Sequence, residues 1–409
     1  MFRHLPPAGN KITIQSLVKA FLLKRECDTI KTFEEDLMNF LKVKYCYLTT
    51  SGTTALFITL CALKNLSDKN EVIVPAYTCP SVLAAVIKAG LKPVLCDLLT
   101  NKPILYYTQL EKRVTDKTLA IITVHLFGIL EDTSKIDQLT SARHIFHIED
   151  SAQILSPVRE TSDAICNTQM VPGTTGDVGI LSFGRGKPLT LMHGGAIITS
   201  SDIIAKALSE KISTLEEHNI FEKCTIILKS FLYSLFFHPR LYYFLHYFPF
   251  LHLGKTFFNL NFKTKKIDSF TAALGRCTID NIVHLNKMRA EIEQLFVRKL
   301  SRFRDLFLND EHRGFPLLRL PLLLKNNRDR CLILAELNKR GLGATGMYPA
   351  PLNLLENTKS YCNGNGSYAN AQSFAERIIT LPLHSYVTEK DIDVVKNVME
   401  KIIHSTNDA

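Results

Sequence analysis

The sequence has 409 residues, of which 46% are hydrophobic and 22% charged, and its formal net charge is +10 at pH 7. A chain of this length and composition can bury a large core in more than one domain, which excludes a disordered protein. The positive charge favours anionic partners such as nucleotide phosphates or acidic lipids. The sequence has no basic run interleaved with aromatic residues, which would indicate binding of nucleic acid, and no CxxC spacing, which would indicate a metal such as zinc.

The N-terminus and the cysteines bear on the cellular compartment. The first residues lack the apolar core of a signal peptide, no stretch offers about 18 uninterrupted apolar residues, and the cysteines are scattered. Several cysteines lie in apolar runs, where a free cysteine behaves as a small buried side chain. We therefore expect a cytoplasmic protein without a membrane-spanning helix.

Short apolar runs alternate with helical patterns from about residue 45 to residue 200. The pattern predicts strands at residues 46–48, 71–75, 93–97, 119–125, 145–148 and 178–182, and helices at residues 53–63 and 81–89. Continuous apolar strands are typical of a sheet that is buried on both faces. The predicted fold class is therefore α/β, with a mainly parallel central sheet and helices on both faces.

The second half of the chain differs in composition. After a predicted helix at residues 203–218 comes an aromatic-rich stretch, residues 226–253, which Pro239 and Pro249 interrupt. A long helix over residues 272–303, strands at 317–324 and 377–381 and a closing helix at 389–403 predict a smaller α+β domain. We expect a large domain over residues 1–225, an aromatic connector over 226–265 and a small domain over 266–409.

Lys187 lies on a glycine-rich loop that follows a buried apolar strand and precedes Gly194 and Gly195. An isolated lysine is usually a solvated surface residue, but a lysine on such a loop can form a Schiff base with pyridoxal phosphate. Its amine must be partly desolvated or close to cations, and Arg185 could serve there or contact a phosphate or a substrate carboxylate. Asp150 ends another strand, where it could cap a helix or pair with the pyridinium nitrogen of the same cofactor.

Residues 50–55 connect a predicted strand to a predicted helix. Backbone N–H groups at a helix start, flanked by hydroxyls, form an anion site, although an ordinary N-cap has the same sequence. Gln153 follows Asp150 by one turn and could donate to the ring hydroxyl of the cofactor. The order of these motifs along the chain is more specific than any one of them.

In that order the motifs resemble the DegT/DnrJ/EryC1/StrS aminotransferases, which are fold-type I pyridoxal phosphate enzymes that act mostly on keto sugars attached to nucleotides. The resemblance covers nearly the whole chain and is carried by residues 6–9 (PPAG), 51–56 (SGTTAL), 71–78 (EVIVPAYT), 124–128 (VHLFG), 149–153 (EDSAQ), the lysine loop, 348–352 (YPAPL) and 381–384 (LPLH). It implies the fold-type I transferase fold and a homodimer whose active sites lie at the subunit interface.

The resemblance also implies a role for each site residue. Lys187 would carry the cofactor, Asp150 would face its ring nitrogen, and Gln153 would lie near its ring hydroxyl. The phosphate would be held by Gly52, Thr53 and Ser182. The amino donor would be glutamate or glutamine, and the acceptor a nucleotide-linked keto sugar.

The chain departs from the family pattern near the expected substrate. Cys79 stands where the family usually has an aromatic residue over the ring, so either Cys79 packs on the cofactor or Tyr77 stacks on it instead. His193 stands where an acidic residue is common, and the loop around Arg185 is unusual; with Tyr348, these two residues are candidate substrate contacts. The lysine is retained, which disfavours the dehydratase branch of the family, where histidine replaces it.

The leading hypothesis is an aminotransferase in which Lys187 moves a proton between the substrate carbon and the cofactor as general acid and base. One alternative is a binding or regulatory protein that keeps the fold without turnover, because fold alone does not establish activity. Another is a pyridoxal phosphate enzyme that acts on a lipid-linked or otherwise hydrophobic carbonyl substrate at a membrane surface.

The aromatic-rich residues 226–253 bear on that last alternative. One interpretation is a peripheral contact with an acidic membrane surface, with Lys229 and Arg240 at the level of the headgroups. The other is an extended dimer interface or a helical cover over the cofactor domain, because large aromatic side chains suit interfaces equally well.

Overall fold

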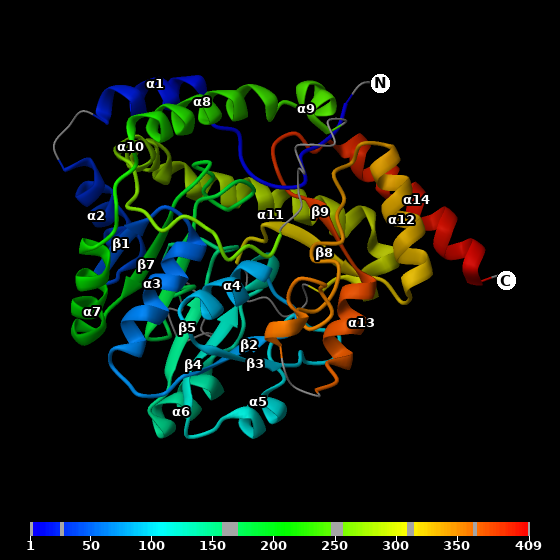
Figure 1. Cartoon of the computed structure of the whole chain (residues 1–409). Coiled ribbons are helices and arrows are strands. Elements are labelled where there is room, and N and C mark those ends of the chain that lie inside the picture. Colours follow the sequence, from blue (N-terminus) through cyan, green and yellow to red (C-terminus); the bar gives the residue numbers. More distant parts are fainter. Residues whose placement is uncertain are drawn as a thin grey trace, which may run out of the picture.

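The computed structural model describes residues 3–24, 28–157, 171–246, 257–308, 315–362 and 366–407. At its centre lies a seven-stranded sheet with the strand order β1-β7-β6-β5-β4-β2-β3 (Figure 1). Its strands are β1 (Tyr45–Thr49), β2 (Glu71–Pro75), β3 (Lys92–Cys96), β4 (Thr118–Val124), β5 (Phe146–Asp150), β6 (Val178–Ser182) and β7 (Gly195–Thr199). The neighbours among β2 to β6 pair in parallel, and β7 runs antiparallel to β1 and β6. The predicted mainly parallel α/β sheet is confirmed.

Successive side chains of a strand point to opposite faces of the sheet, so the side chains on the two faces belong to different hydrophobic clusters. In β7, Ile197 belongs to one cluster, whereas Ala196 and Ile198 belong to the other. The first cluster includes α3 (Gly52–Lys64), α4 (Pro80–Lys88) and α7 (Asp202–Ser213), and the second includes α1 (Ile14–Leu23), α2 (Thr29–Leu41) and α10 (Ser269–Thr278). A third cluster joins α5 (Tyr107–Arg113) and α6 (Ser134–Arg143) to Ile73 and Ile121 of the sheet. Helices therefore cover both faces, as predicted (Figure 1).

The described part of the aromatic-rich stretch forms the helices α8 (Ile220–Phe236) and α9 (Pro239–His246), and residues 247–253 lie outside the described residues. A capping box begins α8: the Asn219 side chain accepts from the N–H of Glu222 over 2.9 Å, and the Glu222 carboxylate accepts from the N–H of Asn219 over 3.1 Å. The domain boundary expected after residue 225 falls inside α8, and the division into three parts stays a prediction.

The helices α1, α8 and α9 lie along one side of the molecule (Figure 1). On its inner side α8 holds the N-terminal segment, because the Tyr233 hydroxyl donates to the Asn10 carbonyl over 3.1 Å and the Ser234 hydroxyl donates to the Ile12 carbonyl over 2.6 Å. Among the described residues, no helix has both the length and the apolar composition needed to cross a membrane.

The C-terminal part pairs β8 (Arg319–Leu323) with β9 (Ile378–Pro382) in antiparallel fashion, beside α12 (Asn327–Lys339), α13 (Ala369–Arg377) and α14 (Glu389–Asn407). The single helix predicted over residues 272–303 is wrong: α10 ends at Thr278, a 3-10 turn follows, and α11 spans Ile282–Lys299. The Thr278 hydroxyl donates to the carbonyl of Leu274 over 2.7 Å, and such back-bonding of a hydroxyl bends helices. Further 3-10 turns span Leu126–Gly128, Ser301–Leu306 and Lys359–Tyr361.

Candidate active site

A cavity of about 250 Å³ opens at the edge of the sheet where the parallel strands have their carboxyl ends. Ligands of open α/β sheets bind at this edge because the loops that leave the strands converge there. The cavity brings together nine of the predicted site residues: Gly52, Thr53, Cys79, Asp150, Gln153, Ser182, Arg185, Lys187 and Tyr348. The structure places the other two, Tyr77 and His193, outside its lining.

Backbone hydrogen bonds fix the loop that carries Lys187. The N–H of Phe183 donates to the carbonyl of Gly194 over 2.9 Å, and the N–H of Leu191 donates to the carbonyl of Phe183 over 2.8 Å, so the loop leaves β6 and returns to β7 at one place. Gly186 has φ +74°, a left-handed conformation that glycine adopts without strain. Lys187 is thereby held half-buried in the cavity wall.

A buried arginine holds the residue that follows the lysine. The Arg289 guanidinium donates to the carbonyl of Pro188 over 2.9 Å and to the Asn10 side chain over 2.8 Å, and Asn10 also donates to the Pro188 carbonyl. Arg289 is 1% exposed, and burial lowers its pKa to about 10. These contacts restrain the backbone next to Lys187 from two other parts of the chain.

Asp150 ends β5 and faces the same cavity. Burial raises the pKa of its carboxyl group, whereas the nearby Lys187 and a hydrogen bond from the N–H of Ala152 over 3.0 Å lower it. Within the described ranges Asp150 forms no ion pair, so its carboxylate is available to a cation in the cavity. A protonated pyridine ring is such a cation.

Two glycines allow the start of α3 to approach the ends of β6 and β7 closely. A Cβ on Gly52 would lie 2.9 Å from the Cβ of Ser182, and a Cβ on Gly195 would lie 2.4 Å from the backbone nitrogen of Gly52. Ser51 caps the helix by accepting from the N–H of Thr54 over 3.0 Å. The remaining N–H groups of the first turn, with the Ser182 hydroxyl beside them, suit a phosphate.

The amide of Gln153 has a defined orientation. Its oxygen accepts from the N–H of Phe127 over 3.0 Å, and its nitrogen lies 3.4 Å from the hydroxyl of Tyr348 as a donor. Gln153 is 5% exposed and lines the cavity, so its N–H₂ group is the end available to a ligand.

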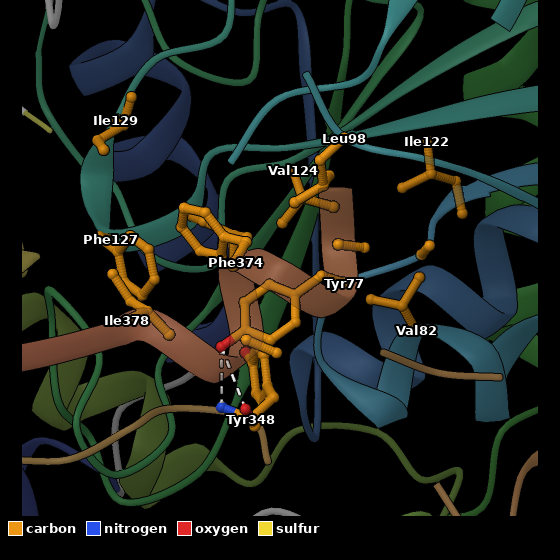
Figure 2. Packing of buried hydrophobic residues seen from close by; sticks show 14 of the residues in the cluster. Tyr77, Val82, Leu98, Ile122, Val124, Phe127, Ile129, Tyr348, Phe374 and Ile378 are labelled. Carbon is orange, nitrogen blue, oxygen red and sulfur yellow. Dashed lines mark hydrogen bonds between the residues drawn. The ribbon is translucent and has the colours of Figure 1, made fainter. Parts of the chain in front are cut away.

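Tyr77 lies in the core beside the cavity and not in its wall. The Tyr77 hydroxyl donates to the carbonyl of Tyr348 over 3.2 Å and accepts from the N–H of Tyr348 over 3.3 Å (Figure 2). Its ring packs edge-on against the rings of Tyr348 and Phe374 at 5.5 Å and 5.3 Å between centroids. Of the two residues considered for the cofactor ring, Cys79 is therefore the one in the cavity wall.

His193 points to a different part of the molecule. Its Nε2 lies 2.8 Å from the carboxylate of Asp268, the N-cap of α10, and its Nδ1 lies 3.4 Å from the hydroxyl of Thr50. These contacts join the lysine-loop region to α10. They do not bring His193 to the cavity that Lys187 lines.

Three residues that were not predicted from the sequence also line the cavity: Ser81, Arg319 and Thr345. Arg319 carried a signal, because it is the one charged residue in the apolar run of residues 315–324. Its side chain donates to the hydroxyl of Thr345 over 2.9 Å. Ser81 and Thr345 had no comparable signal, because hydroxyl residues are common in every kind of loop.

Comparison with known proteins agrees with this geometry. A sequence profile of the DegT/DnrJ/EryC1/StrS aminotransferase family matches residues 12–401. The chain belongs to the DegT/DnrJ/EryC1/StrS aminotransferase family. As a member of this DegT family it is a pyridoxal phosphate-dependent aminotransferase, and the cavity residues described above fit that cofactor at its ring nitrogen, its phosphate and its aldehyde.

Similar proteins cover most of the chain. An uncharacterized protein of Methanocaldococcus jannaschii, MJ1066, is 26% identical over 91% of this chain and 89% of its own length. A UDP-N-acetyl-3-dehydro-alpha-D-glucosamine 3-aminotransferase of Acidithiobacillus ferrooxidans is 24% identical over 87% of this chain and 83% of its own. The structure of PseC from Helicobacter pylori, an aminotransferase involved in the biosynthesis of pseudoaminic acid, superposes with a TM-score of 0.75 at 18% identity, over 98% of this chain and 100% of that one. These likenesses support the DegT family fold along the whole chain.

Proposed function

We propose that this protein transfers the amino group of glutamate or glutamine to a keto sugar attached to a nucleotide. The observation that carries the proposal is that Lys187 and Asp150 line one cavity at the carboxyl edge of the sheet. The name of the Acidithiobacillus ferrooxidans relative, a nucleotide-sugar aminotransferase, supports the class of acceptor.

The roles follow from the positions of the side chains. Bound pyridoxal phosphate supplies an electrophilic aldehyde and a ring that accepts electrons. Lys187 would hold the cofactor through Nζ and, once displaced by the incoming amine, would carry a proton on Nζ between the substrate carbon and the cofactor. The Asp150 carboxylate would hold the proton on the ring nitrogen, because a buried negative charge favours the cationic form of its neighbour.

The remaining predicted contacts orient the cofactor. Gly52, Thr53 and Ser182 would bind the phosphate at the start of α3, and Gln153 would donate to the ring hydroxyl. Cys79 would pack against the ring, where its sulfur is smaller than the aromatic residue usual in the family.

The visible absorption spectrum tests this assignment. The purified protein should be yellow, and borohydride should fix the cofactor to a peptide that contains Lys187, whereas Lys187→Ala should give neither result. Glutamate or glutamine should convert the cofactor to its amino form, which is seen as a loss of the yellow band. A protein that binds the cofactor but reacts with no amino acid would instead favour the alternative of a binding or regulatory protein.

A second proposal concerns the outer side of α1 and α8, which we infer to be a contact with an anionic membrane surface. Phe221 is 80%, Leu228 59% and Leu235 54% exposed along one stripe of α8, and Leu22 of the adjacent α1 is 65% exposed. The sole acidic residue of α1, α8 and α9 is Glu222, which Lys263 and Lys265 neutralise at 2.6 Å and 2.7 Å. The exposed Lys229 follows Leu228 in α8, and the exposed Lys19 lies in α1. An apolar stripe that is flanked by cations and has no free carboxylate suits acidic lipid headgroups.

Sedimentation with vesicles tests this contact. The protein should sediment with vesicles of anionic lipid more than with neutral ones, and the double variant Leu228→Ser, Leu235→Ser should lose that binding. The homodimer that the family resemblance implies would be measured on the same samples by light scattering. A variant that becomes monomeric would show that this face joins two subunits, and the membrane contact would then be rejected.

A further inference from the structure

Arg319 lies at the start of β8, and its guanidinium lines the cavity that contains Lys187. One of its nitrogens, Nη1, donates to the hydroxyl of Thr345 over 2.9 Å and lies 3.4 Å from the hydroxyl of Thr380. Burial lowers the pKa of Arg319 to about 10. In the part of the chain that the structure describes, no carboxylate pairs with it, so the buried charge is compensated by neutral groups alone.

The cavity has an excess of positive charge. Of its twenty lining residues, Arg185, Lys187 and Arg319 are cationic and Asp150 alone is acidic. With the cofactor bound, the family roles engage Lys187 and Asp150 with the cofactor itself. Arg319 then remains without a negative partner, and burying such a charge is costly unless a ligand supplies the anion, whereas the exposed Arg185 keeps its contact with water.

Tyr242 of the aromatic helix α9 lies near the two arginines of the cavity lining. Burial raises the pKa of Tyr242 to about 12, and the nearby cations Arg319 and Arg185 lower it in part, which places both guanidinium groups near one phenol. Tyr348 lines the cavity as well, 5% exposed. The described hydrogen-bond partners of Arg319 are hydroxyls, and Asp150, the one acidic residue of the cavity lining, forms no ion pair with it.

Distance from the reacting carbon distinguishes the two anions that an aminotransferase meets. A carboxylate attached to the reacting carbon lies next to that carbon, whereas the phosphates of a nucleotide sugar lie on the far side of the sugar. The half-buried Arg319 suits the near anion, and the exposed Arg185 is open to solvent.

We propose that Arg319 binds the α-carboxylate of the amino donor and so selects α-amino acids over simple amines. This inference rests on the proposed aminotransferase function. The planar guanidinium can offer two parallel N–H groups to a carboxylate, a geometry that a lysine cannot reproduce. Thr345 and Thr380 hold it through Nη1 and leave its other nitrogens for the ligand.

The test compares the holoenzyme with Arg319→Gln, Arg319→Lys and the matched control Arg340→Gln, which changes an exposed arginine paired with Glu336 at 2.7 Å. The first readout is binding of 2-oxoglutarate by calorimetry, which needs no turnover. Arg319→Gln should weaken it about 10- to 100-fold, Arg319→Lys less, and the control not at all. Unchanged binding in Arg319→Gln would overturn the inference.

The second readout is the rate of cofactor conversion by L-glutamate and by 4-aminobutyrate, which is glutamate without its α-carboxylate. Arg319→Gln should lower kcat/KM for glutamate and leave the slow reaction with 4-aminobutyrate nearly unchanged. An equal loss with both amines would show a structural role and reject the inference.

Binding of uridine diphosphate tests whether Arg319 instead contacts the phosphates of a nucleotide sugar. If Arg319→Gln weakens uridine diphosphate and not 2-oxoglutarate, the arginine serves the nucleotide and the carboxylate assignment is wrong. A wild-type enzyme that binds 2-oxoglutarate through Arg319 but aminates no nucleotide sugar would reject the proposed acceptor and leave this inference standing.

Discussion

The guanidinium of Arg289 and the carbonyl oxygen of Pro188 are joined by a hydrogen bond of 2.9 Å across 101 positions of sequence. Pro188 follows Lys187 directly, so the bond ties α11 to the backbone of the lysine loop. Asn10, from the N-terminal segment, donates to the same carbonyl. The position of Lys187 therefore depends on two segments that lie far from it in the sequence.

Replacing Arg289 with methionine should destabilise the protein by about 2–4 kcal/mol, because it leaves buried acceptors on Asn10, Asn286 and Pro188 without this donor. The cofactor should also be lost faster on dialysis. Urea unfolding of the holoenzyme measures the first effect and the yellow band the second. The exposed Arg340→Met is the control and should change stability by less than about 0.5 kcal/mol.

Asp150→Asn keeps the shape of the side chain and removes its charge. Since an amide cannot hold the proton on the ring nitrogen, the reaction of the cofactor with glutamate should slow by roughly 100-fold or more. Borohydride should still fix the cofactor to Lys187, because the attachment does not need the carboxylate. A variant that reacts at the normal rate would show that Asp150 does not serve the ring.

Gly52→Ala tests the phosphate end of the cavity. The added Cβ would lie 2.9 Å from the Cβ of Ser182, and such overpacking costs about 1–3 kcal/mol. We expect pyridoxal phosphate to bind about 10-fold more weakly or worse, as measured by titration of the apo protein. Gly184→Ala is the control for folding. Its added Cβ would have no atom closer than 3.8 Å, so the melting temperature should not change.

Glu149 predicts a pH dependence of stability. Burial raises the pKa of its carboxyl group, but a hydrogen bond with His125 at 3.0 Å and N–H donors including that of Gly176 outweigh this and lower it to about 2. The unfolded chain takes up a proton near pH 4.5, so the stability that Glu149 contributes is present above that pH and is lost as the pH falls towards 2.

The matched variant isolates this contribution. At about pH 6, Glu149→Gln should be less stable than the wild type by about 3 kcal/mol, and the difference should shrink at about pH 3. Urea midpoints at both pH values measure it. A difference that stays constant with pH would contradict the assignment, and the control Glu210→Gln should show no difference at either pH.

The amino-acid sequence by itself determined the sheet, the lysine loop and the family. Continuous apolar runs that alternate with helical patterns are typical of a sheet buried between two layers of helices, so the pattern predicted the parallel α/β sheet. Lys187, Asp150 and Gly52 were recognised because each lies next to the end of a strand, and parallel strands end at a common edge. Local chemistry and chain order carried these predictions.

Tertiary structure alone decided which side chains reach the cavity. Tyr77 and Cys79 are two positions apart, yet only Cys79 lines it, because the Tyr77 hydroxyl pairs with the distant backbone of Tyr348. Arg319 likewise reaches the cavity, and Arg289 the carbonyl of Pro188 beside Lys187, from elsewhere in the chain. Contacts between residues far apart in sequence depend on how the layers pack in three dimensions, and the local pattern of residues does not contain that arrangement.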